Sequence, residues 1–277
     1  MIPYARGRVR SRESADVCAE IRELAAAGYR EVVLTGIHLS SYGIDCDSSL
    51  LELIQTLHEI NGIERIRLGS LEPGIITEDF VQALVKLPKV CPHFHLSLQS
   101  GSSTVLKRMN RRYTPEEYLE KCDLLRQYYE HPAITTDIIV GFPGETEEEF
   151  KETCDFVKKV DFYEVHVFKY SKRNGTVAAS MPDQIPEEVK EERQAELMEL
   201  QQDIVFDQAE DRIGEELLVM IEGKVADENA YVGRTYRDAP NVDGLIFVNT
   251  SEELMSGDFA KVKVTGSADY DLIGELL

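Results

Sequence analysis

Hydrophobic positions along the chain follow two alternating periods up to about residue 209. Stretches with apolar residues three or four positions apart predict helices with one buried face. They alternate with short β-branched runs that are typical of buried parallel strands. The runs EVVLTG, RIRLGS, FHLSLQ, ITTDIIVGF and YEVHVFKYS predict five strands. A long amphipathic helix over about residues 186–210 follows the last of them.

Capping residues mark the starts and ends of several predicted helices. Thr114 and Thr146 are each followed three positions later by a glutamate, which is the capping-box pattern, and Gly28 is placed to end the first helix. Repeated strand–helix units with short links indicate a parallel sheet covered by helices, either as an open sheet or as a barrel. No G-x-G-x-x-G turn follows any of the five strands, so a dinucleotide-binding fold gains no support.

The pattern changes near residue 210. The runs EELLVMIEG, AYVGRTYR, DGLIFVN, DFAKVKVTG and DYDLIGELL are short, β-rich and separated by Gly, Asn, Asp and Pro. This spacing predicts a small antiparallel β-barrel. We therefore expect an α/β domain at residues 1–209 and a barrel domain at residues 210–277.

Composition and charge narrow the class of protein. Hydrophobic residues make up 43% of the 277 residues, and no apolar run reaches the roughly 18 residues of a membrane span, so we expect a packed cytoplasmic protein with no membrane contact. The net charge is −21, yet residues 1–12 carry four arginines and no acid, whereas residues 210–277 carry fifteen acids and six bases. Because the chain is acidic overall, only local basic patches could bind nucleic-acid phosphates, and the candidate patches are residues 6–12 and 107–112.

Cysteine and histidine spacing gives no sign of a metal centre. The five cysteines are at least 28 residues apart, so C-x-x-C and C-x-x-x-C-x-x-C motifs are absent, and their odd number argues against a disulfide framework. His38 has no second histidine or acid at ligand spacing. We therefore expect no metal ligands in this chain and interpret the cysteines as small buried hydrophobes.

Polar residues follow the ends of several predicted strands, where ligands bind in parallel α/β folds. The turn GFPGET comes after one strand, and a glycine-rich turn lets backbone approach a ligand closely. Its three following glutamates suit a nucleotide triphosphate poorly. Singly, each of these stretches is compatible with a purely structural turn. Together they predict one shared mouth, formed by LTGIHLSSYG, HLSLQSGSSTVLKRMN, the GFPGET turn and FKYSKRNGT.

These stretches, with IPYARGRVRSR and YSKRNGTVAA, closely resemble the methylthiotransferase family of radical S-adenosylmethionine enzymes over essentially the whole chain. The resemblance implies an open, partial (β/α) barrel of the TIM type, followed by the small barrel called TRAM. In the family, IPYARGR comes directly after a C-x-x-x-C-x-x-C loop. The resemblance therefore implies that this chain lacks the first barrel strand, the core cluster cysteines and the domain that holds a second cluster. We expect a fragment that is inactive alone.

The family's chemistry requires S-adenosylmethionine, two [4Fe–4S] clusters whose ligands are not in this chain, and an electron donor. Carried over by position, the resemblance assigns seven residues to the binding of S-adenosylmethionine: Thr35, Gly36, Gln99, Asp137, Gly141, Phe168 and Tyr170. The basic residues expected to meet the substrate are Arg6, Arg8, Lys107, Arg108 and Arg111.

The resemblance does not decide between two substrates. LTGIHLSSYG and LQSGS are similar to the branch that inserts a methylthio group at C2 of threonylcarbamoyladenosine 37 of tRNA. Three stretches of the tail are similar to the branch that modifies an aspartate of a small-subunit ribosomal protein: PDQIPEEVKEER, VGRTYRDAPNVDGLIFV and GDFAKVKVTGSADYDLIGE. Core motifs and basic patches favour the tRNA anticodon loop, while the acidic tail favours the ribosomal protein. A non-catalytic binding fragment is the third alternative.

Overall fold

The computed structural model describes residues 7–277. Five parallel strands form the core: β1 (Glu31–Leu34), β2 (Arg65–Leu68), β3 (His93–His95), β4 (Ala133–Val140) and β5 (Glu164–Lys169). The helices of the core are α2 (Ser14–Ala26), α3 (Leu50–His58), α4 (Glu78–Leu84), α5 (Ser103–Arg108), α6 (Pro115–Tyr128), α7 (Glu147–Val160) and α8 (Glu187–Glu210). Short 3₁₀ turns lie at Leu39–Ser41, Pro73–Ile75 and Ala178–Ser180. No helix of the described residues is long and apolar enough to cross a membrane.

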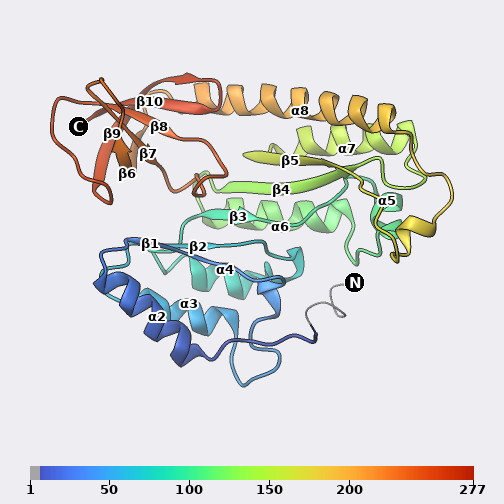
Figure 1. Ribbon diagram of the computed structural model, residues 1–277, viewed down its shortest axis with the longest axis horizontal. Coiled ribbons are helices and arrows are strands. Elements are labelled where there is room, and N and C mark those ends of the chain that lie inside the picture. The colour runs from blue at the N-terminus through green and yellow to red at the C-terminus, as the bar shows by residue number, and fades with distance from the viewer. Residues whose placement is uncertain (1–6) are drawn as a thin grey trace.

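The strands form an incomplete barrel wall in the order of the chain. β1 pairs with β2, and β3, β4 and β5 pair in sequence, all in parallel. Single bridges from Ile66 to Val90 and from Leu71 to Leu96 link the two groups. Ile66, Leu96 and Ile138 lie on the helix-covered face, in one hydrophobic core. The predicted open, partial barrel is therefore confirmed (Figure 1).

Local sequence fixes the helix boundaries as predicted. The Thr114 hydroxyl accepts a hydrogen bond from the Glu117 backbone, and the Glu117 carboxylate accepts one from the Thr114 backbone. Thr146 and Glu149 repeat this capping box at α7. Reciprocal capping satisfies N–H groups that the first helical turn leaves free.

The C-terminal region is a closed barrel with its own apolar core. Its strands are β6 (Glu216–Lys224), β7 (Ala230–Arg234), β8 (Ile246–Asn249), β9 (Phe259–Ala268) and β10 (Asp271–Leu276). Four of the five neighbouring pairs are antiparallel, as predicted, and β10 runs parallel to β8. Five strands cannot alternate in direction all the way around a closed ring, so at least one neighbouring pair must be parallel.

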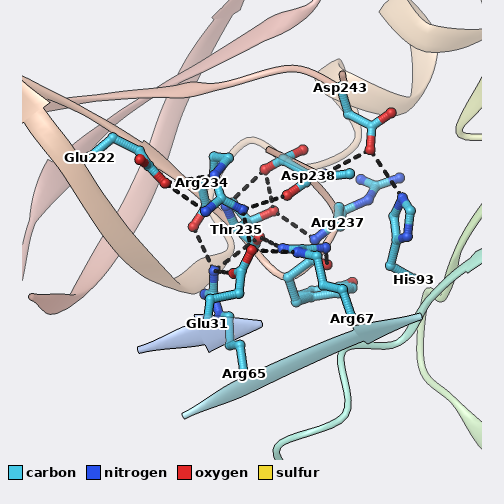
Figure 2. Close-up of polar contacts among 12 residues, drawn as sticks. Glu31, Arg65, Arg67, His93, Glu222, Arg234, Thr235, Arg237, Asp238 and Asp243 are labelled. Carbon is cyan, nitrogen blue, oxygen red and sulfur yellow. Dashed lines mark hydrogen bonds and ion pairs between the residues drawn. The ribbon is translucent and has the colours of Figure 1, made fainter. Parts of the chain in front are cut away.

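The C-terminal barrel packs against the amino-terminal ends of the core strands. Figure 2 shows the contact at β1 and β2, where Glu31 accepts hydrogen bonds from Arg67 (3.0 Å) and Arg234 (2.7 Å). Arg65 and Arg67 also donate to carbonyl oxygens of the C-terminal barrel.

The same contact continues along the other strands. His93 of β3 meets Asp243 at 3.0 Å. Just before β4 the His131 carbonyl accepts from Tyr236, and just before β5 Tyr163 donates to Asp238. The carboxyl-terminal ends of the strands therefore lie at the end of the core away from the C-terminal barrel.

Candidate functional site

The inner face of the incomplete barrel is polar. Side chains alternate between the two faces of a strand, and the face opposite the apolar core carries charged and polar groups. These groups are Glu31, Arg65, Arg67, His93, His95, Thr135, Asp137, Glu164 and His166. Buried polar groups cost free energy unless they are paired, so each must have a partner or bind a ligand.

The amino-terminal part of this face is occupied by the contact with the C-terminal barrel. Glu31, Arg65, Arg67 and His93 all have partners there. Glu164 lies nearby, where burial, assisted by the negative charge of Asp243, raises its pKa to about 7. This part of the inner face therefore holds two domains together.

Toward the carboxyl ends, His95, Asp137 and His166 form a second polar group. His95 Nε2 lies 3.5 Å from Asp137 Oδ2, and the two imidazole rings stack with centroids 6.0 Å apart. Thr135 Oγ1 and His95 Nδ1 share a hydrogen bond of 2.9 Å, which orients the ring. All three side chains are partly exposed. His95 and His166 were not predicted from the sequence, because the group comes from three strands and has no spacing motif along the chain.

Thr35 and Gly36 lie in a groove of about 830 Å³ beside β1, which pairs only with β2 among the described residues. Arg8 lines the same groove, so the structure brings these three predicted residues together. The segment that carries Arg8 is held in place, because the Ser11 N–H donates to Asp45 at 2.9 Å and the Tyr42 hydroxyl donates to the Arg12 carbonyl. Arg6, predicted to meet substrate, lies outside the described residues.

Gln99 and Asp137, both assigned by the resemblance, are neighbours in the structure. The Gln99 N–H donates to the Asp137 carbonyl, and the Ile139 N–H donates back to the Gln99 carbonyl, both at 2.9 Å. Gln99 has a φ of +76°, which is uncommon for a residue with a side chain. Such backbone strain is held by its surroundings and clusters at functional sites.

The other predicted residues at the strand ends differ in their surroundings. The Gly141 N–H donates to Glu145 at 2.6 Å, and an added Cβ at this φ of +71° would lie 2.3 Å from Lys190. Gly141 is therefore explained by packing against α8. Phe168 is 52% exposed, and the Tyr170 hydroxyl is buried with no hydrogen-bond partner among the described residues.

The predicted basic patch is partly neutralised. Arg108 binds both carboxylate oxygens of Glu149, at 2.9 and 2.6 Å. This pairing lowers the pKa of Glu149 to about 2. Arg111 lies 3.4 Å from Glu72, whereas Lys107 is exposed. Arg8 is exposed as well and has no ion pair within residues 7–277.

The cysteines do not form a cluster site. Four of them are buried apart from one another, and Cys46 is exposed. Burial raises the pKa of the Cys122 and Cys154 thiols to about 12, which disfavours the thiolate that binds metals. Within the described part of the chain no three thiols converge, so these residues do not fit a [4Fe–4S] cluster.

Comparison with known proteins gives two family matches and two kinds of relative. Residues 1–157 match the Radical SAM superfamily, and residues 213–277 match the TRAM domain. The chain is 44% identical to the tRNA-2-methylthio-N(6)-dimethylallyladenosine synthase of Thermoanaerobacter sp. (strain X514), with 100% of this chain and 58% of the relative aligned. It is 43% identical to the ribosomal protein uS12 methylthiotransferase RimO of Lachnoclostridium phytofermentans, with 99% of this chain and 63% of the relative aligned.

Among solved structures, coproporphyrinogen III oxidase (HemN) from Escherichia coli, described as a radical SAM enzyme, superposes with a TM-score of 0.50. It is 17% identical and aligns with 75% of this chain and 50% of that chain, so the likeness concerns the fold. The chain spans 58% and 63% of the lengths of the two curated relatives named above.

Proposed function

The chain belongs to the radical SAM superfamily, and we propose that it forms most of a methylthiotransferase that modifies an N6-substituted adenosine of tRNA. One observation carries the proposal. The inner face of the barrel presents the polar side chains of His95, Asp137 and His166, and Thr35 and Gly36 follow the carboxyl end of β1 in a groove of about 830 Å³. Active sites of TIM-type barrels lie at this end of the strands.

The residues at this end fit S-adenosylmethionine. The groove offers space beside Thr35 and Gly36, the half-exposed Phe168 ring offers a surface for an adenine, and the buried Tyr170 hydroxyl lacks a partner among residues 7–277. Bound S-adenosylmethionine would supply the methyl group. The described cysteines do not fit an iron–sulfur cluster, so residues 7–277 bind and orient the reactants, and the proposed protein needs further ligands and an electron donor.

The charge distribution supports RNA at the mouth. Arg8, Arg10 and Lys107 are exposed. The arginines of the C-terminal barrel, Arg212, Arg234 and Arg237, are instead buried against acids or the core. The C-terminal barrel also exposes Lys224, Lys261 and Lys263, but residues 210–277 carry fifteen acids against six bases. Phosphates are therefore attracted more strongly to the core end of the molecule than to the C-terminal barrel.

Methylthiolation of an aspartate of a ribosomal protein is the second candidate function. It is favoured by the 43% identity to the relative named for uS12 and by the acidic composition of residues 210–277. A basic protein would complement this acidic barrel.

The experiment uses a protein in which this chain is joined to the core cluster loop and the second cluster domain that the family resemblance implies, prepared anaerobically. It is given tRNA bearing threonylcarbamoyladenosine, tRNA bearing dimethylallyladenosine and small ribosomal subunits in separate reactions, and mass spectrometry locates the methylthio group. We expect it at position 37 of the threonylcarbamoyl tRNA. Modification of the ribosomal aspartate alone would establish the second candidate. Binding of tRNA with no product by an enzyme loaded with clusters would indicate a non-catalytic binding role.

A further inference from the structure

We propose that His95, Asp137 and His166 bind a divalent transition-metal ion on the inner face of the barrel. Each residue offers one ligand atom, and these atoms all lie within 4.8 Å of one another. Two imidazoles and one carboxylate form a donor set that suits Zn²⁺ or Fe²⁺ better than Mg²⁺ or Ca²⁺, which prefer oxygen ligands.

Strand register fixes where the three residues lie. His95 is the register partner of Thr135 on β4, and Asp137 is the register partner of His166 on β5. Thr135 and Asp137 are two positions apart and therefore share a face of β4. Because backbone pairing sets these positions, the ligands stand on rigid elements, as a preformed site requires.

The separations suit a small ion. Ligand atoms at about 2.0–2.1 Å from a tetrahedral zinc ion are roughly 3.3 Å apart. The distance from His95 Nε2 to Asp137 Oδ2 is 3.5 Å, and the stacked His166 ring needs only a modest movement to complete the group. All three side chains are partly exposed, so an ion can reach them.

A further contact orients the first ligand. Thr135 Oγ1 is hydrogen-bonded to His95 Nδ1 at 2.9 Å, which leaves Nε2 directed at Asp137. Ligating histidines usually use their second ring nitrogen in this way. Three protein ligands leave at least one coordination position for water or a substrate atom.

The test uses the 277-residue chain with Cys46→Ser, which removes the one exposed thiol of the described residues. The protein is stripped of metal and titrated anaerobically with Co²⁺, whose visible bands report its ligands, and Zn²⁺ is then added as competitor. We expect one Co²⁺ per chain, displaced by Zn²⁺. His95→Gln, Asp137→Asn and His166→Gln should each abolish this binding.

Matched variants separate the site from general effects. His131→Asn replaces an exposed histidine at a φ of +56°, which asparagine tolerates, and should leave binding unchanged. Thr135→Val should weaken binding by about 10- to 100-fold, the usual cost of losing such a partner. Circular dichroism checks the fold of each variant.

A measurement on the chain with its three ligands intact tests the proposal even where a substituted variant fails to fold. X-ray absorption of the Zn²⁺-loaded chain should show two imidazoles with oxygen ligands and no sulfur. Absence of stoichiometric binding, a sulfur ligand, or binding that survives in a folded His166→Gln variant would each overturn the proposal and leave an ordinary His–Asp ion pair.

Discussion

Replacement of Glu31 by alanine should destabilise the protein strongly, because this carboxylate is shared by three arginines. It lies 2.7 Å from Arg234, 3.0 Å from Arg67 and 3.7 Å from Arg65, and its side chain is only 5% exposed. The three arginine side chains are 1–7% exposed. Without Glu31 they keep their bonds to carbonyl oxygens but lose the negative charge at the centre of the group.

The size of the effect follows from this burial. Removing one partner of a buried ion pair costs about 3–5 kcal/mol, because a buried charge is left without compensation. Glu222 still pairs with Arg234, which places the expected loss near the lower end, about 3 kcal/mol. The matched control is Glu64→Ala, since Glu64 is 49% exposed and lies 3.8 Å from Arg30. Exposed pairs of this kind contribute about 0–1 kcal/mol.

Urea unfolding followed by circular dichroism gives the free energy of unfolding of both variants. Arg67 and Arg234 join the core to the C-terminal barrel through Glu31, so Glu31→Ala should also weaken the coupling between the unfolding of the two parts. A loss below about 1 kcal/mol, or a loss no larger than that of Glu64→Ala, would refute the view that this buried group holds the two barrels together.

The remaining predictions concern pH, association, RNA and iron. Burial raises the pKa of Glu164 from an ordinary 4.5 to about 7 in the folded protein, so its ionisation destabilises the fold as pH rises from about 4.5 to 7. Glu164→Gln should therefore increase the free energy of unfolding by up to about 3 kcal/mol at pH 8 and leave it unchanged at pH 4. Equal effects at the two pH values would contradict this. Val33, 40% exposed on β1, should promote self-association, which Val33→Lys reduces in sedimentation experiments. Joint replacement of Arg8 and Arg10 by alanine should make tRNA affinity less dependent on salt, lowering the slope of log affinity against log salt concentration by up to about 2. Arg108 is already paired with Glu149, so Arg108→Ala should change this slope less. Reconstitution of the 277-residue chain with iron and sulfide should yield no [4Fe–4S] cluster, and about four irons per chain with matching sulfide would disprove this.

Local features of this chain could be predicted from the sequence because neighbouring residues determine them. The capping boxes at Thr114 and Thr146 follow from contacts three residues apart, and the five core strands follow from the alternation of buried runs with helices. The six-residue helix α5 at Ser103–Arg108 was not predicted, because it is too short to show a helical period. The resemblance of the motifs placed the chain among the radical S-adenosylmethionine enzymes, which the superfamily match confirms.

Tertiary structure decided which of these residues meet. Arg108 was predicted to bind substrate, but both of its terminal guanidinium nitrogens donate to Glu149, which is 41 residues away in the sequence. His95 and His166 were not predicted as site residues, but parallel strand pairing places them beside Asp137 on one face of three strands. The C-terminal barrel binds the amino ends of the strands through Glu31 and its partners, so its charge lies away from the mouth. Sequence spacing predicts contacts within one turn or strand, whereas these contacts depend on strand order and register, which only the folded chain defines.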